Sequence, residues 1–211
     1  MIHTFNITQQ GESHIKKDMP CQDYSCTKRM THLDQEIIIA AISDGVGSCE
    51  YSQISSKVAV ESFIECLTFN IENKVEKFSE ETILTILKHA FHYSLSQINK
   101  TSEKDELPFL EYDCTLTGVV YVGNILYFGH VGDDGIVALY SDGKYEMITE
   151  RHKGEEINTV FPLREEDRWQ FGKCEEIVSC VLMTDGVLDF CVDSIAMNNR
   201  VFYPFLQPAL T

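Results

Sequence analysis

Carboxylates that follow apolar segments are the residues of this chain best suited to carry out chemistry. Asp44 and Asp185 each follow a mostly apolar segment and precede a glycine. The sequence "GHVGDDG" places Asp133 and Asp134 after a third apolar segment. Because a buried carboxylate costs free energy unless a partner compensates for it, the pattern predicts a partner for these side chains.

A divalent cation is the partner that this pattern favours. Carboxylates at the ends of strands in one sheet can converge on one point, where they repel each other strongly unless a cation lies among them. Oxygen ligands favour Mg²⁺ or Mn²⁺ over softer metals. The glycine after Asp44 or Asp185 would let the backbone turn tightly and bring a carbonyl close to an ion.

The alternative interpretation is an ordinary turn, because Asp-Gly is also a strong hairpin signal. Asp142-Gly143 lies between two apparent strands and is interpreted as a turn only. No strand follows Asp44 or Asp185 at hairpin distance, so ligation is favoured there. For Asp133 both interpretations stay open, and Asp134 is expected to be a solvated neighbour.

The apolar periodicity predicts an α+β domain in which helices pack outside antiparallel sheets. Two long helices are expected, one from Ser52 or Ser55 to about residue 71 and one over 79–100, with Ser79 as N-cap. A short helix is expected near 201–210, 11–23 is expected to be a loop, and 151–172 is expected to be a surface loop or a short helix. Strands are expected at 2–8, from 23 to about 29, and at 36–43, 114–122, 124–132, 135–141, 145–149 and within 175–186.

Charge and composition exclude some functions. The formal net charge is −16, from 33 acidic residues and 17 Lys and Arg, which argues against general nucleic-acid binding. No apolar run has the length of a bilayer span and the start lacks a signal-peptide pattern, so a cytoplasmic location without a membrane partner is expected. The eight Cys are scattered without a CxxC pair, which favours reduced, packed thiols over a zinc site.

The ordered segments "CQDYS", "AISDGVGS", "CTLTGVVYVGNILYFGHVGDD" and "VLMTDGVLDF" resemble the metal-dependent protein phosphatases of the 2C type, in particular their bacterial branch. The resemblance extends over roughly residues 5 to 190. It implies a single domain over 1–211 with a four-layer αββα sandwich, in which helices flank two antiparallel sheets. It also implies hydrolysis of phosphoserine and phosphothreonine, with phosphorylated proteins as substrates and a serine/threonine kinase as a possible partner.

The resemblance assigns a role to each matched residue. Asp44 matches the Asp that bridges two Mg²⁺ or Mn²⁺ ions, and the Gly45 carbonyl matches the backbone ligand of one of them. Asp185 matches the ligand of the other ion, and Asp23 matches the acid that acts through metal-bound water. Asp133 matches a ligand of a third, weaker ion. The metals activate a water that attacks phosphorus, so Asp44 and Asp23 count as catalytic.

Three residues before Asp23 are candidates for handling the substrate. His14 is the only His in the matched opening segment and is the candidate donor of a proton to the leaving oxygen. Many family members carry an Arg in the first motif that binds the substrate phosphate, and this chain has none there. Lys16 and Lys17 are the candidate substitutes for it, although the interpretation as solvated loop lysines is slightly favoured.

The end of the chain differs from the family pattern and keeps alternatives open. The family closes with a strand that carries an acidic pair, whereas only Asp189 and Asp193 follow Asp185 here. A catalytically weak pseudophosphatase that serves as a binding module is therefore a second hypothesis. A metal-dependent hydrolase of small phosphate esters or nucleotides is a third. Elsewhere, His130 and Trp169 are expected to be packed in the core.

Overall fold

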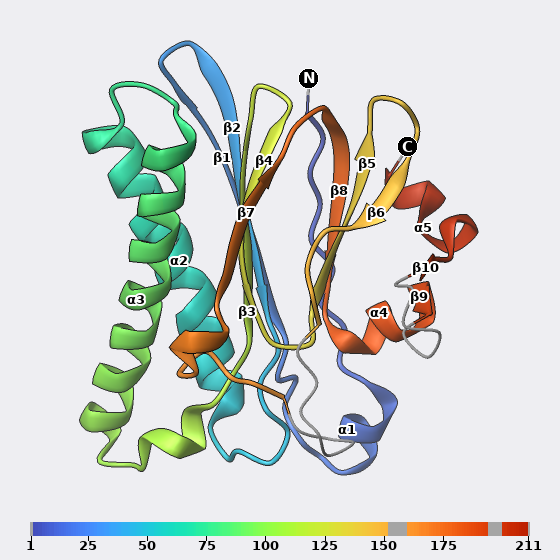
Figure 1. Ribbon diagram of the computed structural model, residues 1–211. Helices are drawn as coiled ribbons and strands as arrows, with labels where there is room; N and C mark the ends of the chain where they lie inside the picture. The colour runs from blue at the N-terminus through green and yellow to red at the C-terminus, as the bar shows by residue number, and fades with distance from the viewer. Residues whose placement is uncertain (1, 152–159, 194–199, 211) are drawn as a thin grey trace.

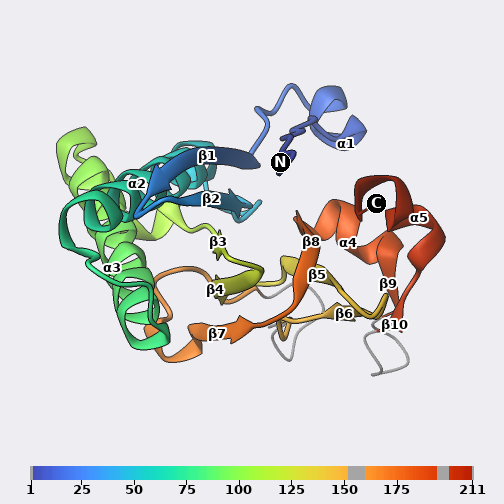
Figure 2. The ribbon, with the colours of Figure 1, turned by 90° about the horizontal axis from the view of Figure 1, so that it is seen from above.

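The protein folds into four layers, as the resemblance implies. The computed structural model describes residues 2–151, 160–193 and 200–210. Two long helices cover one face of a first sheet, a second sheet lies against its other face, and shorter helices cover the outside of the second sheet (Figure 1). Figure 2 shows the same order of layers from above. The predicted α+β sandwich is confirmed.

The first sheet has five antiparallel strands in the order β1-β2-β3-β4-β7. Its strands are β1 (Tyr24–His32), β2 (Gln35–Ser43), β3 (Leu116–Val122), β4 (Ile125–Val131) and β7 (Gln170–Cys174). The central strands β2, β3 and β4 consist mainly of buried β-branched and aromatic residues, because helices cover one face and the second sheet the other.

The second sheet has the order β6-β5-β8 and is also antiparallel. Its strands are β5 (Gly135–Tyr140), β6 (Tyr145–Met147) and β8 (Ile177–Met183). Apolar side chains from both sheets form the core between them: Val119, Leu126, Phe128, Ile136, Ala138 and Ile177. This core fixes the two sheets relative to each other, and with them the residues at the strand ends.

The helices α2 (Ser52–Lys74) and α3 (Glu80–Asp105) form a hairpin on the outer face of the first sheet. The Ser79 side chain accepts a hydrogen bond from the Thr82 backbone N–H, as expected of the N-cap of α3. Phe63 of α2 lies so close to β3 that a Cβ on Gly118 would be 2.3 Å from its ring. This close approach requires a glycine in β3 and sets the distance between helix and sheet.

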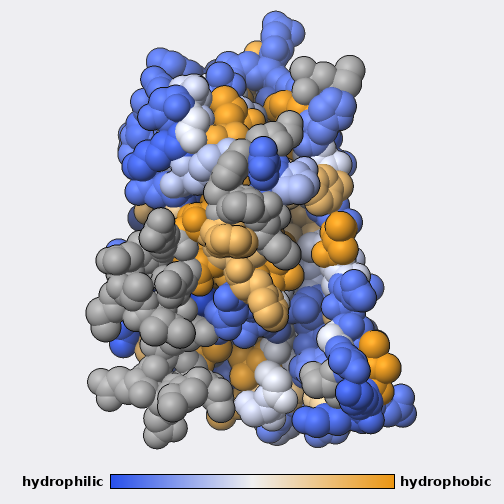
Figure 3. Space-filling view, turned by 90° about the vertical axis from the view of Figure 1, so that its right-hand side faces the viewer, coloured by the Kyte–Doolittle hydropathy of each residue, from blue (hydrophilic) through white to orange (hydrophobic). Residues whose placement is uncertain are grey.

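Two short helices lie outside the second sheet, namely α4 (Asp185–Cys191) and α5 (Tyr203–Leu210), the latter with Pro208 inside it. Leu188 of α4 and Leu206 of α5 are buried against β5, β6 and β8. Phe190 and Phe202 stay exposed, and Figure 3 shows this face of the molecule, where apolar side chains appear among polar ones. Within the described ranges, no helix combines the length and the apolar character needed to cross a membrane.

The remaining elements are short. They are α1 (Glu12–Lys16), the 3-10 helices η1 (Phe109–Tyr112) and η2 (Glu166–Arg168), and the strand pair β9 (Val192–Asp193) and β10 (Arg200–Val201). All eight cysteines are free thiols.

Two expectations about local structure were wrong, and a third was incomplete. Residues 2–8 do not form a strand. They bond to β1 through side chains, with the Asn6 amide 2.6 Å from the Thr27 hydroxyl, so alternation of residue types did not produce a backbone ladder. The segment 11–23 contains α1. The segment 151–172 contains a short helix, η2, as one of its two expected forms, but it also contributes the start of β7, whose few apolar residues did not stand out among charged neighbours. Part of that insert, 152–159, lies outside the described residues.

Candidate active site

The strand-end carboxylates gather at one end of the sandwich, near α1 and α4 in Figure 1. Asp44 follows β2 directly, and Asp23 precedes β1. The two strands are antiparallel, with Tyr24 opposite Ser43, so the register places Asp23 beside Asp44. Asp185 is the first residue of α4, where it follows β8.

The second sheet brings the other acids to the same end. Asp133 and Asp134 form the connection from β4 to β5, and so link the two sheets. Gly135 pairs with Met183 in the β5–β8 register, which places Asp134 close to the start of α4. The topology thus assembles residues that are up to 162 positions apart, from Asp23 to Asp185.

The electrostatics of Asp44 and Asp23 confirm that these acids are close together. Burial, and after it the charges of Asp134, Asp23 and Asp185, raise the pKa of Asp44 to about 10. Burial is also the main reason that the pKa of Asp23 is raised, while a hydrogen bond to Asp44 lowers it. Mutual repulsion of this kind is what a nearby cation relieves.

Asp134 is fully buried, which corrects the expectation that it is a solvated neighbour. Its Oδ2 accepts hydrogen bonds from the hydroxyls of Thr115 at 2.5 Å and Thr117 at 3.4 Å. Burial raises the pKa of Asp134, against the Thr115 hydrogen bond, and the charges of nearby acids raise it further. In the part of the chain that the structure describes, Oδ1 is buried without a hydrogen-bond partner.

Thr115 links the end of β2 to Asp134. This role of Thr115 was not predicted from the sequence. Its hydroxyl accepts from the Asp44 backbone N–H at 2.8 Å, and its own N–H donates to the Asp44 carbonyl at 2.8 Å. The Ser43 hydroxyl donates to the Thr115 carbonyl at 2.6 Å. These bonds fix the backbone on both sides of Asp44. A Thr immediately before a β-strand carries no sequence signal of this role.

Gly45 has a role other than the predicted tight turn. Its φ is not positive, but a Cβ at this position would be 2.7 Å from the Ser52 carbonyl oxygen at the start of α2. Its N–H donates to the Gln22 carbonyl at 3.1 Å. Glycine is therefore required here because the backbone passes close to α2. By contrast, Gly186 lies in α4 with open space around the position of a Cβ.

The candidate substrate-handling residues lie on or beside α1. His14 is half-buried and near Asp23, and its charge contributes to lowering the pKa of that carboxyl. Lys16 is exposed and forms an ion pair with Glu12 at 2.8 Å, one turn earlier in the helix. Lys17 is exposed. The structure thus brings His14 to the carboxylates, whereas the contact seen for Lys16 lies within α1.

Arg151 ties two of the site-bearing segments together. Its Nε donates to the Asp133 carbonyl at 2.8 Å, and Nη1 donates to Oδ1 of Asp189 in α4 at 2.6 Å. The side chain is only 6% exposed. The sequence placed it in a charged insert and gave no reason to select it.

Two other predicted positions have the packed roles expected of them. His130 is buried in β4, where its Nδ1 lies 2.7 Å from the Thr117 hydroxyl and its Nε2 lies 3.1 Å from the Glu150 carbonyl. Trp169 packs edge-on against Phe91 of α3, with the ring centroids 5.3 Å apart. Neither residue is exposed to substrate as a reactive group.

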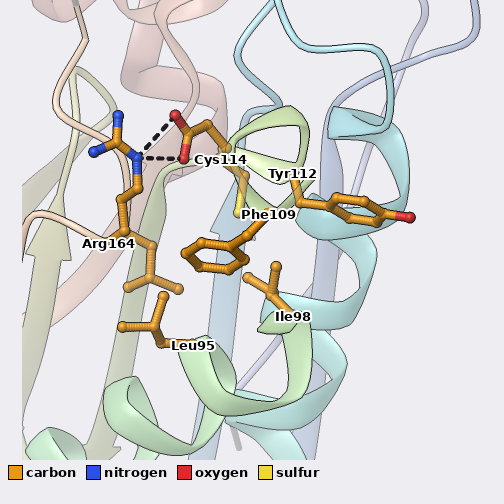
Figure 4. Close-up of a pocket in the computed structure, with 8 residues that line it drawn as sticks. Leu95, Ile98, Phe109, Tyr112, Cys114 and Arg164 are labelled. Atoms are coloured by element: carbon orange, nitrogen blue, oxygen red, sulfur yellow. Dashed lines mark hydrogen bonds and ion pairs between the residues drawn. The ribbon is translucent and has the colours of Figure 1, made fainter. Parts of the chain in front are cut away.

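A small pocket beside the helical hairpin is separate from these acids. It is lined by residues of α3 and η1 and of the segments 113–114 and 163–164. Figure 4 shows Arg164, whose Nε donates to the Asp113 carboxylate at 2.8 and 3.1 Å. Its empty space of about 160 Å³ includes open solvent and leaves no cavity that could hold a water molecule, let alone a ligand. We interpret it as a packing gap, with the ion pair closing its rim.

The donor set at the strand ends fits a hard divalent cation. Every candidate ligand is an oxygen, and Oδ1 of Asp134 is buried without a hydrogen-bond partner among the described residues. Within those same residues, no three His, Cys, Asp or Glu side chains surround one point as metal ligands do. The carboxylates therefore have to turn toward an ion when they bind it, which exchanges their mutual repulsion for ligation.

Comparisons with known proteins agree on one family. The sequence model described as Protein phosphatase 2C matches residues 10–211. Serine/threonine-protein phosphatase 3 of Escherichia coli (strain K12) is 22% identical over 211 residues, which cover 94% of this chain and 78% of that protein. The chain therefore belongs to the protein phosphatase 2C family. Its class is that of the serine/threonine phosphatases, which are hydrolases and, as a family, metal-dependent.

Solved structures confirm the fold. Serine/threonine phosphatase Stp1 from Staphylococcus aureus superposes with a TM-score of 0.62 at 14% identity, over 90% of this chain and 78% of that one. RsbX, solved in complex with magnesium, gives a TM-score of 0.53 at 13% identity, over 86% and 72% of the two chains. At these identities the likeness shows the shared fold alone.

Proposed function

We propose that this chain hydrolyses phosphoserine and phosphothreonine in proteins, with Mg²⁺ or Mn²⁺ bound at the end of the sandwich where α1 and α4 lie. The observation that carries the proposal is the convergence of Asp23, Asp44 and Asp185 from three separate segments at one end of the sandwich. Burial, and after it the charges of Asp134, Asp23 and Asp185, raise the pKa of Asp44 to about 10. The family's two-metal chemistry needs such a cluster of carboxylates.

The proposed ligands are the residues that the resemblance assigned. Asp44, the Gly45 carbonyl and Asp185 would hold two ions, with Asp44 shared between them, while Asp23 would act through water and Asp133 would hold a weaker third ion. When bound, the ions supply a water of lowered pKa as the nucleophile and neutralise charge on the phosphoryl group. No side chain has to serve as the nucleophile.

The residues of α1 complete the proposal. His14 is the proposed donor of a proton to the leaving seryl or threonyl oxygen, and the effect of its charge on Asp23 supports this role. Lys16 and Lys17 are exposed on the same segment and attract the phosphate as point charges. Because Lys16 already pairs with Glu12, substrate binding has to compete with that ion pair.

The biological setting belongs to the same proposal. Phosphorylated proteins are the substrates, a serine/threonine kinase is the partner that makes them, and the cytoplasm is the location. A net charge of −16 disfavours nucleic acid as a partner. Family membership favours an active enzyme over a pseudophosphatase, but two-metal chemistry by itself does not select proteins over small phosphate esters.

The test compares substrates. We expect the purified chain with Mn²⁺ to release phosphate from a phosphothreonine peptide at a kcat/KM at least tenfold higher than from adenosine monophosphate, and EDTA to abolish both activities. A preference for the nucleotide would instead support a small-ester hydrolase. Absence of any metal-dependent turnover, with correct folding shown by circular dichroism, would support the pseudophosphatase.

A further inference from the structure

Asp134 has an environment that folding alone does not explain. Its side chain is 0% exposed, and Oδ2 already has two hydroxyl donors in Thr115 and Thr117. Oδ1 has no hydrogen-bond partner in the described part of the chain. A buried carboxylate oxygen without a partner costs free energy, and such an atom in a native fold calls for an explanation.

The position of Asp134 points to the cation site. A single hydroxyl, that of Thr115, separates it from Asp44: Thr115 Oγ1 donates to Asp134 Oδ2 at 2.5 Å and accepts from the Asp44 N–H at 2.8 Å. Of all charged groups, Asp134 has the largest effect on the Asp44 carboxyl, and Asp185 and Asp23 act on Asp134 in turn. Asp134 therefore lies near enough to Asp44, Asp23 and Asp185 for their charges to interact.

We propose that Asp134, through Oδ1, is a direct ligand of the divalent cation held by Asp44 and Asp185. The proposal rests on the proposed function, in that it requires the strand-end carboxylates to bind Mg²⁺ or Mn²⁺. It adds a ligand that neither the resemblance nor the sequence pattern assigned. The hydrogen bonds from Thr115 and Thr117 to Oδ2 orient the carboxylate, as partners of metal ligands commonly do.

The competing explanation is a neutral, purely structural acid. In that case Asp134 carries no charge and serves only as an acceptor for the hydroxyls of Thr115 and Thr117. The two explanations differ in what Asp134→Asn does. Asparagine keeps the shape and an acceptor oxygen for the threonines but is a much weaker metal ligand than a carboxylate.

The experiment is Mn²⁺ titration by calorimetry of the wild-type chain, Asp134→Asn and the control Asp142→Asn. Asp142 lies on the exposed β5–β6 turn at the opposite end of the sandwich, where its Oδ1 accepts from the Lys144 N–H at 2.8 Å. We expect Asp134→Asn either to bind one ion fewer than the wild type or to bind Mn²⁺ with more than about 100-fold lower affinity. Loss of a residue that only orients a metal ligand already lowers metal affinity about 10–100-fold. We expect Asp142→Asn to bind like the wild type.

Unchanged stoichiometry and affinity in folded Asp134→Asn would overturn the proposal while leaving the proposed function intact. Failure of the wild type to bind Mn²⁺ would overturn both. A crystal structure of the wild type with Mn²⁺ decides the matter even when the variant does not fold. An ion about 2.0–2.3 Å from Oδ1 supports ligation, and a distance beyond about 3.5 Å contradicts it.

Discussion

At the scale of single residues, the position of the backbone at Asp44 is as important for the proposed metal site as the carboxylates themselves. Asp44 is held from both sides, by two hydrogen bonds to Thr115 and by the neighbouring Gly45, which packs against the first residue of α2. The side chain of Asp44 is half-buried, so small backbone shifts change its distance to the other acids. Residues that only fix the backbone are therefore expected to affect metal binding.

The two glycines that follow the predicted ligands provide a matched pair of substitutions. Gly45→Ala places a Cβ 2.7 Å from the Ser52 carbonyl, so we expect a loss of about 1–3 kcal/mol in the free energy of unfolding. Gly186→Ala meets open space within a helix, so we expect no loss and a gain of up to about 1 kcal/mol. Urea denaturation measures both, and equal effects would contradict this account of Gly45.

At the scale of elements, side-chain bonds add to the β5–β8 pairing in holding the segments of the site together. Arg151 bonds the β4–β5 connection, through the Asp133 carbonyl, to α4, through Asp189. Burial of its guanidinium makes these bonds stronger than an exposed ion pair. The helix that begins with Asp185 is thus tied to the segment that carries Asp133 and Asp134.

Substitution of Arg151 tests this connection. We expect Arg151→Met to lower the free energy of unfolding by about 1–3 kcal/mol, because the Asp133 carbonyl and the Asp189 carboxylate lose a charged donor. We also expect weaker Mn²⁺ binding, because α4 is less firmly placed. The control is Lys57→Met, which removes an exposed ion pair with Glu61 and should change stability by less than about 0.5 kcal/mol. An effect of Arg151→Met no larger than that of the control would refute the role of Arg151.

At the scale of the whole molecule, the two sheets meet at an apolar interface but bring repelling acids together at one end. The net charge of −16 adds to this repulsion. A ligand that binds only the folded chain stabilises it, and a cation placed among the acids also relieves the repulsion. The protein should therefore be noticeably less stable without metal than with it.

Thermal unfolding measures this dependence. At Mn²⁺ concentrations near 100 times the dissociation constant, binding contributes about 2.7 kcal/mol, and we expect Tm to rise by roughly 5–10 °C relative to EDTA. The rise should be absent in Asp44→Asn. An equal rise in that variant would place the stabilising ion somewhere other than the strand ends.

The sequence predicted the layers of the fold because most elements are long and regular in their apolar pattern. The helices α2 and α3 and most strands appear where the periodicity indicated. Prediction from the sequence failed where the local pattern and the tertiary context differ. Residues 2–8 alternate like a strand but bond to β1 through side chains.

The candidate site was predictable only in part. Asp44 and Asp185 stand out because apolar strands precede them, and Asp23 because of the resemblance. Asp134 and Thr115 did not stand out, because their burial and their mutual hydrogen bond arise only when β3 and the β4–β5 connection meet in space. Arg151 was hidden among other charged residues for the same reason.

The measurement that tests the central claim most directly is the initial rate of phosphate release from a phosphothreonine peptide as Mn²⁺ is titrated. Three proteins are compared: the wild type, Asp44→Asn and the surface control Asp142→Asn. The account predicts saturable, metal-dependent turnover in the wild type and the control, and a rate at least about 10³-fold lower in Asp44→Asn, the typical scale for loss of a group that stabilises the transition state. Equal rates for Asp44→Asn and the wild type would contradict it.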